Sequence, residues 1–479
     1  MSLFDRRPSL WFAVGALLLC LAHMRWGIGV VAFLAPIPML RGLRLGGSTW
    51  LFFAFTIIGW TLAVLKICTD PIPAPFAIAF ALPTAVFLGL PYYAWSKVQG
   101  SLSGVHGAVF LAAGLVVGEW LQHTFTDFAS WGAAAYTQLD DLALLQLASV
   151  TGMAGVSFVV YFIAACIEAI WAGRLRTSAG VWLLGLWVAL HVAGNARVHT
   201  FEQERDTVLS AAITTDATFG GLPLPSDDRR REVKEGLEIR TREAASAGAE
   251  LIVWTEAAAL VLPSEEEAWL TRLQDLAGEL RIELVAAYVV PVSVDPLKYE
   301  NKYAWLTPEG RLDHTYLKNH PVFGEPAIPG VGPVPQRETA FANVSGAICY
   351  DYDYPSMGLQ RTDVDLVALP SSDWRGIDPV HTRMAGLRAI EAGHSVLRST
   401  RFGLSAGIDP AGRVLGSMSA FDAGADILLV HLPTKGVTTI YGLLGDWFIA
   451  LAGLLFAGYA TVHVRSRPAP SESRAGGRL

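Results

Sequence analysis

FANVSGAICYDYDYP, residues 341–355, decides how the polar part of this chain is interpreted. It contains a short apolar run that ends at Cys349, the only cysteine in a polar stretch of more than 200 residues. The other three cysteines lie in or beside long apolar runs, where a thiol usually behaves as a small buried hydrophobic group. A lone cysteine at the end of a strand-like run in a polar domain is a candidate nucleophile rather than a disulfide partner.

Composition sets the broad class of the protein. The chain has 479 residues, of which 52% are hydrophobic and only 16% charged, against about 25% charged in ordinary soluble domains. Lipid must therefore solvate part of it. The formal net charge of -7 gives no support to nucleic-acid binding. The cysteines form no CxxC pair and the histidines show no metal-ligand spacing, so we expect no metal site and no cofactor.

Apolar segments flank the polar stretch on both sides. A membrane-spanning helix takes about 20 mainly apolar residues. We expect spans at residues 9–24, 27–42, 49–68, 76–95, 105–123, 145–172, 179–196 and 440–463. The predicted domains are residues 1–200 with seven spans, 201–435 as a polar domain, 436–464 with the eighth span, and 465–479 as a disordered cytoplasmic tail.

The charges of the short loops predict the orientation. If the N-terminus is cytoplasmic, the cytoplasmic loops and tail carry Arg6, Arg7, Arg41, Arg44, Lys97, Arg174, Arg176, Arg465 and Arg467. The opposite loops are mainly acidic, with Arg25 and Lys66 as exceptions. This distribution follows the positive-inside rule, and because seven spans come first, the polar domain lies outside the cytoplasm.

Residues 207–433 alternate between short apolar runs and amphipathic stretches. Strand-like runs are TVLSAAIT, AELIVWT, ELVAAYVVPV, FANVSGAIC, VDLVALP, HSVLRST and DILLVHL. Amphipathic helices are expected at residues 227–247, 264–280 and 381–392. Nearly continuous apolar runs suit strands that are buried on both faces, and the alternation predicts a layered α/β domain.

Three side chains of the polar domain suit covalent catalysis. Glu256 and Cys349 directly follow strand-like runs, and Lys318 lies in HTYLKNHPVFGEP. Functional groups gather at the carboxyl ends of strands in α/β sheets. A carboxylate can take the proton of a thiol nucleophile, and an ammonium group favours the thiolate and an oxyanion. Each residue alone also has an ordinary structural explanation, and spacing does not prove that the three converge.

The motifs around these residues resemble those of a known family. LIVWTEAA, YLKNHPVFGE, GAICYDYDYP and VALPSSDWRG are similar to segments of the carbon–nitrogen hydrolase (nitrilase) superfamily. With its membrane segments, the whole chain resembles the membrane-bound branch formed by bacterial apolipoprotein N-acyltransferases. The resemblance implies a nitrilase-like αββα sandwich joined to a helical membrane domain of about eight helices.

The same resemblance implies residue roles. Glu256 would be the general base, Lys318 the oxyanion stabiliser and Cys349 the nucleophile. Further residues implied at or near the substrate are Glu325, Tyr350, Asp351, Glu119, Trp120 and Trp374.

The implied reaction is an N-acyl transfer. A phospholipid would acylate the cysteine, and the N-terminal amine of a diacylglyceryl-cysteine apolipoprotein would accept the chain. The implied protein is a monomer in the bacterial inner membrane with a periplasmic catalytic domain. Loops at residues 222–228 or 322–334 could exclude water from the thioester. A membrane-tethered amidase with the same three residues is the main alternative, and an inactive scaffold or a transporter is a further one.

Several residues depart from the family pattern. Thr255 replaces a typical proline before the glutamate, and Asp351 replaces a usual glutamate after the nucleophile. Arg401 and Phe402 stand where small polar residues are usual. These departures leave the three catalytic candidates intact, and they bear on the identity of the substrate because they border the pocket.

Overall fold

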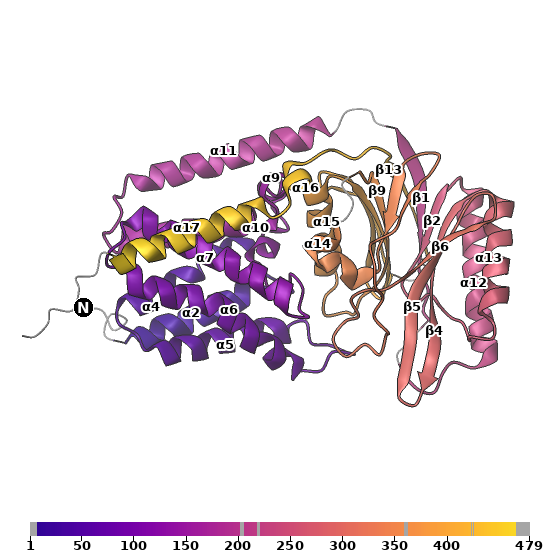
Figure 1. The fold of residues 1–479 in the computed structure, drawn as a ribbon, viewed down its shortest axis with the longest axis horizontal. Coiled ribbons are helices and arrows are strands. Elements are labelled where there is room, and N and C mark those ends of the chain that lie inside the picture. Colours follow the sequence, from indigo (N-terminus) through magenta and orange to yellow (C-terminus); the bar gives the residue numbers. More distant parts are fainter. Residues whose placement is uncertain are drawn as a thin grey trace, which may run out of the picture.

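The computed structural model describes residues 7–465, apart from 202–205, 218–220, 359–362, 423, 425 and the side chains of 462–465. A bundle of apolar helices, built from both ends of the chain, lies beside an α/β domain built from its middle (Figure 1). The predicted disordered tail lies, beyond its first residue, outside the described residues.

The helical part contains long and short helices. They are α2 (Pro8–Ala22), α3 (Gly29–Ala32), α4 (Pro36–Arg44), α5 (Thr49–Leu65), α6 (Phe76–Val98), α7 (Gly104–Phe125), η1 (Ala134–Gln138), α8 (Leu142–Leu145), α9 (Ala148–Thr151), α10 (Met153–Trp171), α11 (Ala179–Thr200), α16 (Ile440–Leu444) and α17 (Trp447–Arg465). Four of them, α6, α7, α10 and α11, are long and apolar enough to cross a membrane. Other apolar helices, including α2, α5 and α17, are shorter by the same measure.

Two predicted spans are interrupted. Residues 27–42 form the short helices α3 and α4, because Pro36 and Pro38 begin a new helix where the predicted span would continue. Residues 145–172 turn at Gly152, whose φ of +65° separates α9 from α10. A side chain there would lie 2.4 Å from the ring of Tyr441, so both conformation and packing require glycine.

Helix α11 stands apart from the bundle (Figure 1). Only 6% of its most apolar window is buried, and Trp182 is 80% exposed. A groove of about 970 Å³ separates part of α11 from α3, α8 and α10. An apolar surface of this size is typical of a helix that contacts lipid or another protein.

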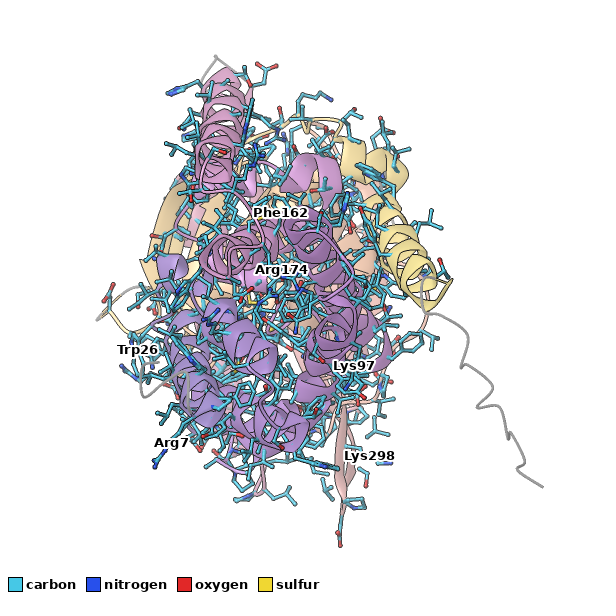
Figure 2. All side chains as sticks on the ribbon, turned by 90° about the vertical axis from the view of Figure 1, so that its left-hand side faces the viewer. Arg7, Trp26, Lys97, Phe162, Arg174 and Lys298 are labelled. Atoms are coloured by element: carbon cyan, nitrogen blue, oxygen red, sulfur yellow. The ribbon has the colours of Figure 1, made fainter. Side chains whose placement is uncertain are left out.

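Basic residues collect at one end of the bundle. Arg44 pairs with the buried Glu168 at 2.6 Å, and Arg44 and Arg174 line the same small cavity. Figure 2 looks onto the side of the molecule that is on the left in Figure 1, and labels Arg7, Lys97 and Arg174. The α/β domain contacts the other ends of the helices, where Ile67, just after α5, accepts a hydrogen bond from Trp374.

The α/β domain contains two sheets. Its strands are β1 (Thr207–Ile213), β2 (Leu251–Trp254), β3 (Ala259–Leu260), β4 (Glu283–Val294), β5 (Leu297–Leu306), β6 (Leu312–Leu317), β7 (Gln336–Glu338), β8 (Asn343–Gly346), β9 (Leu366–Ser372), β10 (Ser395–Arg401), β11 (Leu404–Ile408), β12 (Val414–Ser419) and β13 (Ile427–Pro433). Its helices are α12 (Asp227–Ser246), α13 (Glu266–Leu280), η2 (Cys349–Asp353), α14 (Pro355–Gly358) and α15 (Val380–Ala392).

The sheets have matching parallel centres and antiparallel edges. One runs β13-β1-β2-β4-β5-β6, with β3 on β4, and the other runs β12-β11-β10-β9-β8-β7. β1, β2 and β4 are mutually parallel neighbours, as are β8, β9 and β10. The central strands are almost wholly buried, as the continuous apolar runs predict.

The sheets face each other across one apolar core and carry helices on their outer faces. Leu251 and Val285 of one sheet pack in the same cluster as Leu366 and Leu397 of the other. Helices α12 and α13 cover the first sheet, and α15 lies between the second sheet and the membrane helices (Figure 1). The domain is therefore an αββα sandwich, as predicted, with one helical layer packed against the bundle.

Candidate active site

Three strand ends bring the predicted catalytic residues to one edge of the sandwich. Glu256 lies two residues after β2, Lys318 directly follows β6, and Cys349 opens η2 three residues after β8. The backbone N–H of Glu256 donates to the carbonyl of Ser371 in β9, at 3.2 Å, and so joins the two sheets beside the site. All three side chains are buried, with Glu256 and Cys349 3% exposed and Lys318 1%.

Lys318 is held between two carboxylates. Its Nζ donates to Oε1 of Glu256 at 2.7 Å and to Oε2 of Glu325 at 2.8 Å. Burial alone would lower the pKa of Lys318, but the two carboxylates outweigh burial and raise it well above its usual range. Two of the three ammonium hydrogens are used, which leaves one for an oxyanion.

Asn301 joins the same two carboxylates. Its Nδ2 donates to Oε1 of Glu256 at 2.7 Å and to Oε1 of Glu325 at 2.9 Å. Glu325 also accepts the backbone N–H of Val322, and Lys318 holds the pKa of Glu325 below its usual value against the effect of burial. Among the described residues no hydrogen bond reaches Oε2 of Glu256, so this oxygen is the one available to take a proton.

Cys349 has a strained backbone at the start of η2. Its φ is +48°, in the left-handed region that a non-glycine residue enters at a cost of about 1–3 kcal/mol. The Sγ–H donates to the carbonyl of Ser372 at 3.4 Å. Burial, followed by Glu256, raises the pKa of Cys349 well above its usual value, while Lys318 acts in the opposite direction. The resting nucleophile is therefore a neutral thiol that needs a base.

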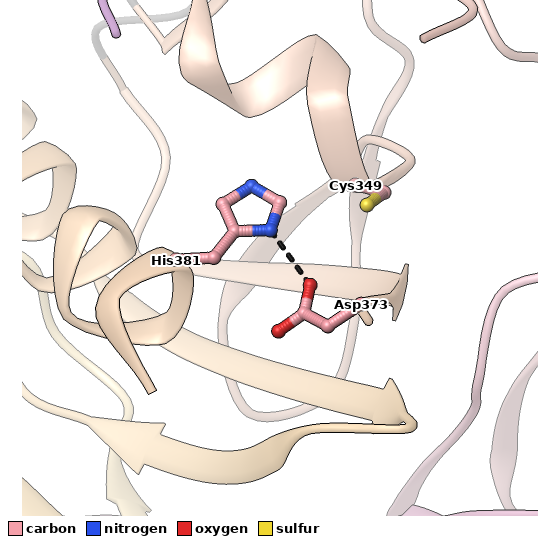
Figure 3. A group of neighbouring side chains, drawn as sticks. All are labelled: Cys349, Asp373 and His381. Atoms are coloured by element: carbon pink, nitrogen blue, oxygen red, sulfur yellow. Dashed lines mark hydrogen bonds and ion pairs between the residues drawn. The ribbon is translucent and has the colours of Figure 1, made fainter. Parts of the chain in front are cut away.

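Asp373 and His381 also lie near the thiol (Figure 3). Ligand atoms of Cys349, Asp373 and His381 lie within 4.8 Å of one another, a spacing that could hold a metal ion. The Nδ1 of His381 is 2.7 Å from Asp373, however, and Arg398 contacts both oxygens of that carboxylate at 2.8 and 3.1 Å. A guanidinium thus already supplies positive charge at this carboxylate.

His381 joins this group to the helical bundle. Its Nε2 is 2.9 Å from Asp353, which also accepts the indole N–H of Trp131 at 2.7 Å. Burial lowers the pKa of His381, but Asp353 and Asp373 outweigh burial and raise it to about 9. The imidazole is therefore a cation at neutral pH, held between two carboxylates, and is not a proton acceptor.

The other predicted residues of the catalytic domain support the nucleophile or join the two parts. The OH of Tyr350 donates to the carbonyl of Asp127 at 2.7 Å. Trp374 donates to a carbonyl at the end of α5. Asp351 accepts hydrogen bonds from Tyr316 and from the backbone N–H of His320. Both are close to the triad in sequence, since Tyr316 precedes and His320 follows Lys318 by two residues.

Glu119 and Trp120 have separate environments. Glu119 is buried among the helices, where its Oε1 accepts hydrogen bonds from the backbone of Ala134 at 2.8 Å and from Tyr161 at 2.7 Å. Trp120 donates to Asp446 at 3.0 Å. The structure joins neither side chain to the group around Cys349 by a direct contact.

Sequence reasoning missed Asn301, Asp373 and His381. One signal was available for Asn301, because Tyr299, Asn301 and Tyr303 alternate along β5 and all face inward. An amide among inward-facing aromatic residues needs a polar partner. His381 gave no such signal, since its two carboxylate partners come from separate segments.

The similarities to known proteins cover both parts of the chain. Residues 15–166 match the apolipoprotein N-acyltransferase N-terminal domain, and residues 224–440 match the carbon–nitrogen hydrolase domain. These two matches define a carbon–nitrogen hydrolase domain coupled to an apolar helical domain.

Whole-length relatives agree with this class. The apolipoprotein N-acyltransferase of Pseudomonas syringae pv. tomato is 26% identical over 453 residues, covering 88% of this chain and 87% of the relative. That of Brucella melitensis biotype 1 is 28% identical over 446 residues, covering 82% of this chain and 81% of the relative. The chain belongs to the apolipoprotein N-acyltransferase family and is an acyltransferase.

Solved structures are similar over about half of the chain. An amidase from Nesterenkonia sp. is 20% identical, with a TM-score of 0.40, over 49% of this chain and 93% of the amidase chain.

Proposed function

We propose that this enzyme transfers an acyl chain from a membrane phospholipid, through a thioester on Cys349, to the N-terminal amine of a diacylglyceryl-cysteine apolipoprotein. The observation that carries the proposal is the buried ion pair of Lys318 and Glu256, both of which act electrostatically on the Cys349 thiol. This arrangement supplies a base, an oxyanion partner and a nucleophile, which are the three groups that acyl transfer through a thioester needs.

The first half-reaction acylates the enzyme. Oε2 of Glu256 accepts the thiol proton as Sγ of Cys349 attacks the ester carbonyl. The third hydrogen of the Lys318 ammonium group stabilises the oxyanion of the tetrahedral intermediate. The intermediate collapses with cleavage of the ester C–O bond, and the protonated Glu256 returns its proton to the departing lysophospholipid oxygen. The raised pKa of the thiol requires proton removal and attack to be coupled.

The second half-reaction transfers the chain. The neutral amine of the acceptor attacks the thioester carbonyl, and Glu256 accepts a proton from the nitrogen. The C–S bond breaks, the sulfur regains the proton, and the product is an amide. Glu325 positions the lysine and Asn301 positions the base throughout, since Glu325 bonds to Lys318, Asn301 bonds to Glu256, and the two bond to each other.

A lid over the site follows from the burial of the thiol. Segment 322–334 is anchored to Lys318 at two points, where Oε2 of Glu325 accepts a hydrogen bond from the Lys318 ammonium group at 2.8 Å and the backbone N–H of Gly330 donates to the Lys318 carbonyl at 2.7 Å. The ring of Phe323 lies 5.8 Å from that of Phe76 at the start of α6. We propose that the turn around Phe323 moves to admit the lipid and then excludes water from the thioester.

We further propose the domain boundaries, the membrane orientation and a monomeric state. Residues 1–200 and 436–464 form a membrane domain of about eight segments, some of them broken, and residues 201–435 form the catalytic domain. The basic end of the bundle, marked by Arg44 and Arg174, is opposite the catalytic domain, which supports a cytoplasmic basic end and a periplasmic active site in the inner membrane. Protease protection of the catalytic domain in right-side-out vesicles would contradict this orientation.

The experiment that tests the function measures transfer itself. Purified full-length enzyme in phospholipid micelles is incubated with a synthetic diacylglyceryl-cysteine peptide, and N-acylated peptide is followed by mass spectrometry. We expect transfer by the wild type, none by Cys349→Ala, and near-normal transfer by Cys166→Ala, a control thiol in α10. Transfer by Cys349→Ala at the wild-type rate contradicts the mechanism, and release of free fatty acid without any N-acylated peptide contradicts the proposed acceptor.

A further inference from the structure

Arg401 is a buried cation that shares a hydrogen-bonding partner, Ser372, with the nucleophile. It ends β10 and is 6% exposed. Its Nε donates to Oγ of Ser372 at 3.2 Å, and the carbonyl of the same Ser372 accepts the Cys349 thiol at 3.4 Å. Ser372 therefore connects the two groups, because its hydroxyl binds the guanidinium and its carbonyl orients the sulfur.

Only part of the guanidinium is occupied. Nη1 donates to the carbonyl of Ala217 at 2.5 Å and lies 3.4 Å from that of Ala257. Among the residues that the structure describes, no group bonds to Nη2, and this nitrogen is not sealed from solvent. A guanidinium fixed by two nitrogens presents the third in a defined direction, which suits recognition of an oxyanion.

Arg401 also changes the charge of the site. It interacts electrostatically with Glu256, Glu325 and Cys349. Glu256, Glu325 and Lys318 alone would carry one formal negative charge and would repel an anion. With Arg401 the group is formally neutral, so an approaching anion meets a free N–H donor without a net opposing charge. Burial lowers the pKa of Arg401, which shows that the cation is poorly solvated and gains from an anionic partner.

We propose that Arg401 binds the phosphodiester of the acyl donor and thereby makes the site selective for ester donors that carry a phosphate. The inference rests on the proposed function and names the recognition group of the donor. In a glycerophospholipid the acyl esters and the phosphate are on the same three-carbon backbone, so a donor bound through its phosphate at Nη2 carries its ester carbonyls within a few bonds of that contact. Arg401 is then a specificity-determining residue and takes no part in proton transfer.

The test compares two donors with identical acyl chains in one detergent. Dipalmitoylphosphatidylglycerol carries a phosphodiester, and dipalmitoylglycerol carries none. Acylation of Cys349 in the full-length enzyme is followed by intact-protein mass spectrometry for the wild type, Arg401→Gln and Arg401→Lys. Arg375→Gln, at an exposed side chain of the same domain, is the matched charge control.

We expect Arg401→Gln to lower the acylation rate per donor concentration about 10- to 100-fold with the phospholipid, mainly through KM, and less than about threefold with dipalmitoylglycerol. Arg401→Lys keeps the charge and recovers part of the loss, and it serves in place of Arg401→Gln should that variant not fold. Arg375→Gln retains the wild-type donor preference.

Equal losses with both donors overturn the inference, because they indicate a role in the oxyanion or in the scaffold. Unchanged rates in both Arg401 variants overturn it as well. Failure of the proposed function is a separate result: the wild-type enzyme itself then takes no acyl chain from phospholipid, which contradicts the donor and, with it, recognition of its phosphate.

Discussion

Replacing Asn301 by alanine should slow acylation of Cys349, although all three proposed catalytic side chains remain in place. Its Nδ2 donates to both buried carboxylates of the site, at 2.7 Å to Glu256 and 2.9 Å to Glu325. A hydrogen bond to a charged group contributes about 1.5–3 kcal/mol, and the bond to Glu256 orients the base. Loss of that one contribution in the transition state corresponds to about a 10- to 150-fold slower step.

The assay is single-turnover acylation of the enzyme in phospholipid micelles, quenched at intervals and analysed by intact mass. Asn343→Ala makes the same chemical change at the start of β8, where the amide bonds to an exposed backbone carbonyl, and should leave the rate within about twofold. Asn301→Asp adds a third carboxylate and should be slower than Asn301→Ala. A rate for Asn301→Ala equal to that of the control would refute the role of this bridge.

Further predictions concern the charged groups outside the triad. His381→Gln should lose a stabilisation on the order of 3 kcal/mol, which in the wild type is fully present below pH about 6.5 and is lost as the pH rises through about 9. The melting temperature of the variant should therefore fall less over that pH range than that of the wild type. Parallel pH profiles of the two proteins would contradict the imidazolium assignment. Arg44→Ala leaves Glu168 buried and unpaired and should destabilise the bundle by about 3–5 kcal/mol. Its melting temperature in detergent should be lower than that of Arg231→Ala, which removes an exposed ion pair. Equal melting temperatures would count against a structural role for the Arg44–Glu168 pair. Trp131→Phe removes the indole hydrogen bond to Asp353 and should slow acylation about tenfold or more with little change in donor KM. An unaltered rate would show that this link between the helical bundle and the α/β domain is not needed for turnover.

The layered α/β domain was predictable because its central strands are continuous apolar runs. The predicted run AELIVWT contains the buried parallel strand Leu251–Trp254, and VDLVALP contains most of Leu366–Ser372, which continues two residues beyond that run. Strand β6, Leu312–Leu317, was missed, since LDHTYL is half polar and half exposed, although it carries the chain to Lys318. Edge strands lack the apolar signal that central strands give.

The sequence predicts where the apolar segments lie, but it does not predict which of them are broken into shorter helices. Hydropathy places an apolar segment at residues 27–42, yet a helix that meets Pro36 and Pro38 must restart there. Hydropathy also does not show which surfaces meet protein, because α11 and α7 have similar mean hydropathies of 1.4 and 1.5, yet 6% of the apolar window is buried in α11 and 67% in α7. Membrane packing depends on the shape of the side chains as well as on their polarity.

The sequence predicts the types of catalytic group in the candidate site, but it does not predict the contacts that hold them together. The residue types of Glu256, Lys318 and Cys349 indicate a base, a cation and a nucleophile, and their strand-end positions indicate one edge. The bridging amide of Asn301 and the imidazolium of His381 depend on partners that are distant in sequence, so only the folded chain reveals them. Arg401 stood out in the sequence as a departure, and its burial beside the thiol gives that departure a chemical meaning.

The central claim is a covalent acyl-enzyme at a single sulfur. Purified enzyme exposed to a phospholipid of one defined chain length, without an acceptor, should gain the mass of one acyl group on the peptide that contains Cys349, and an added lipopeptide amine should remove it. Acyl transfer that proceeds with no adduct at Cys349, or with the adduct on another residue, would contradict the account.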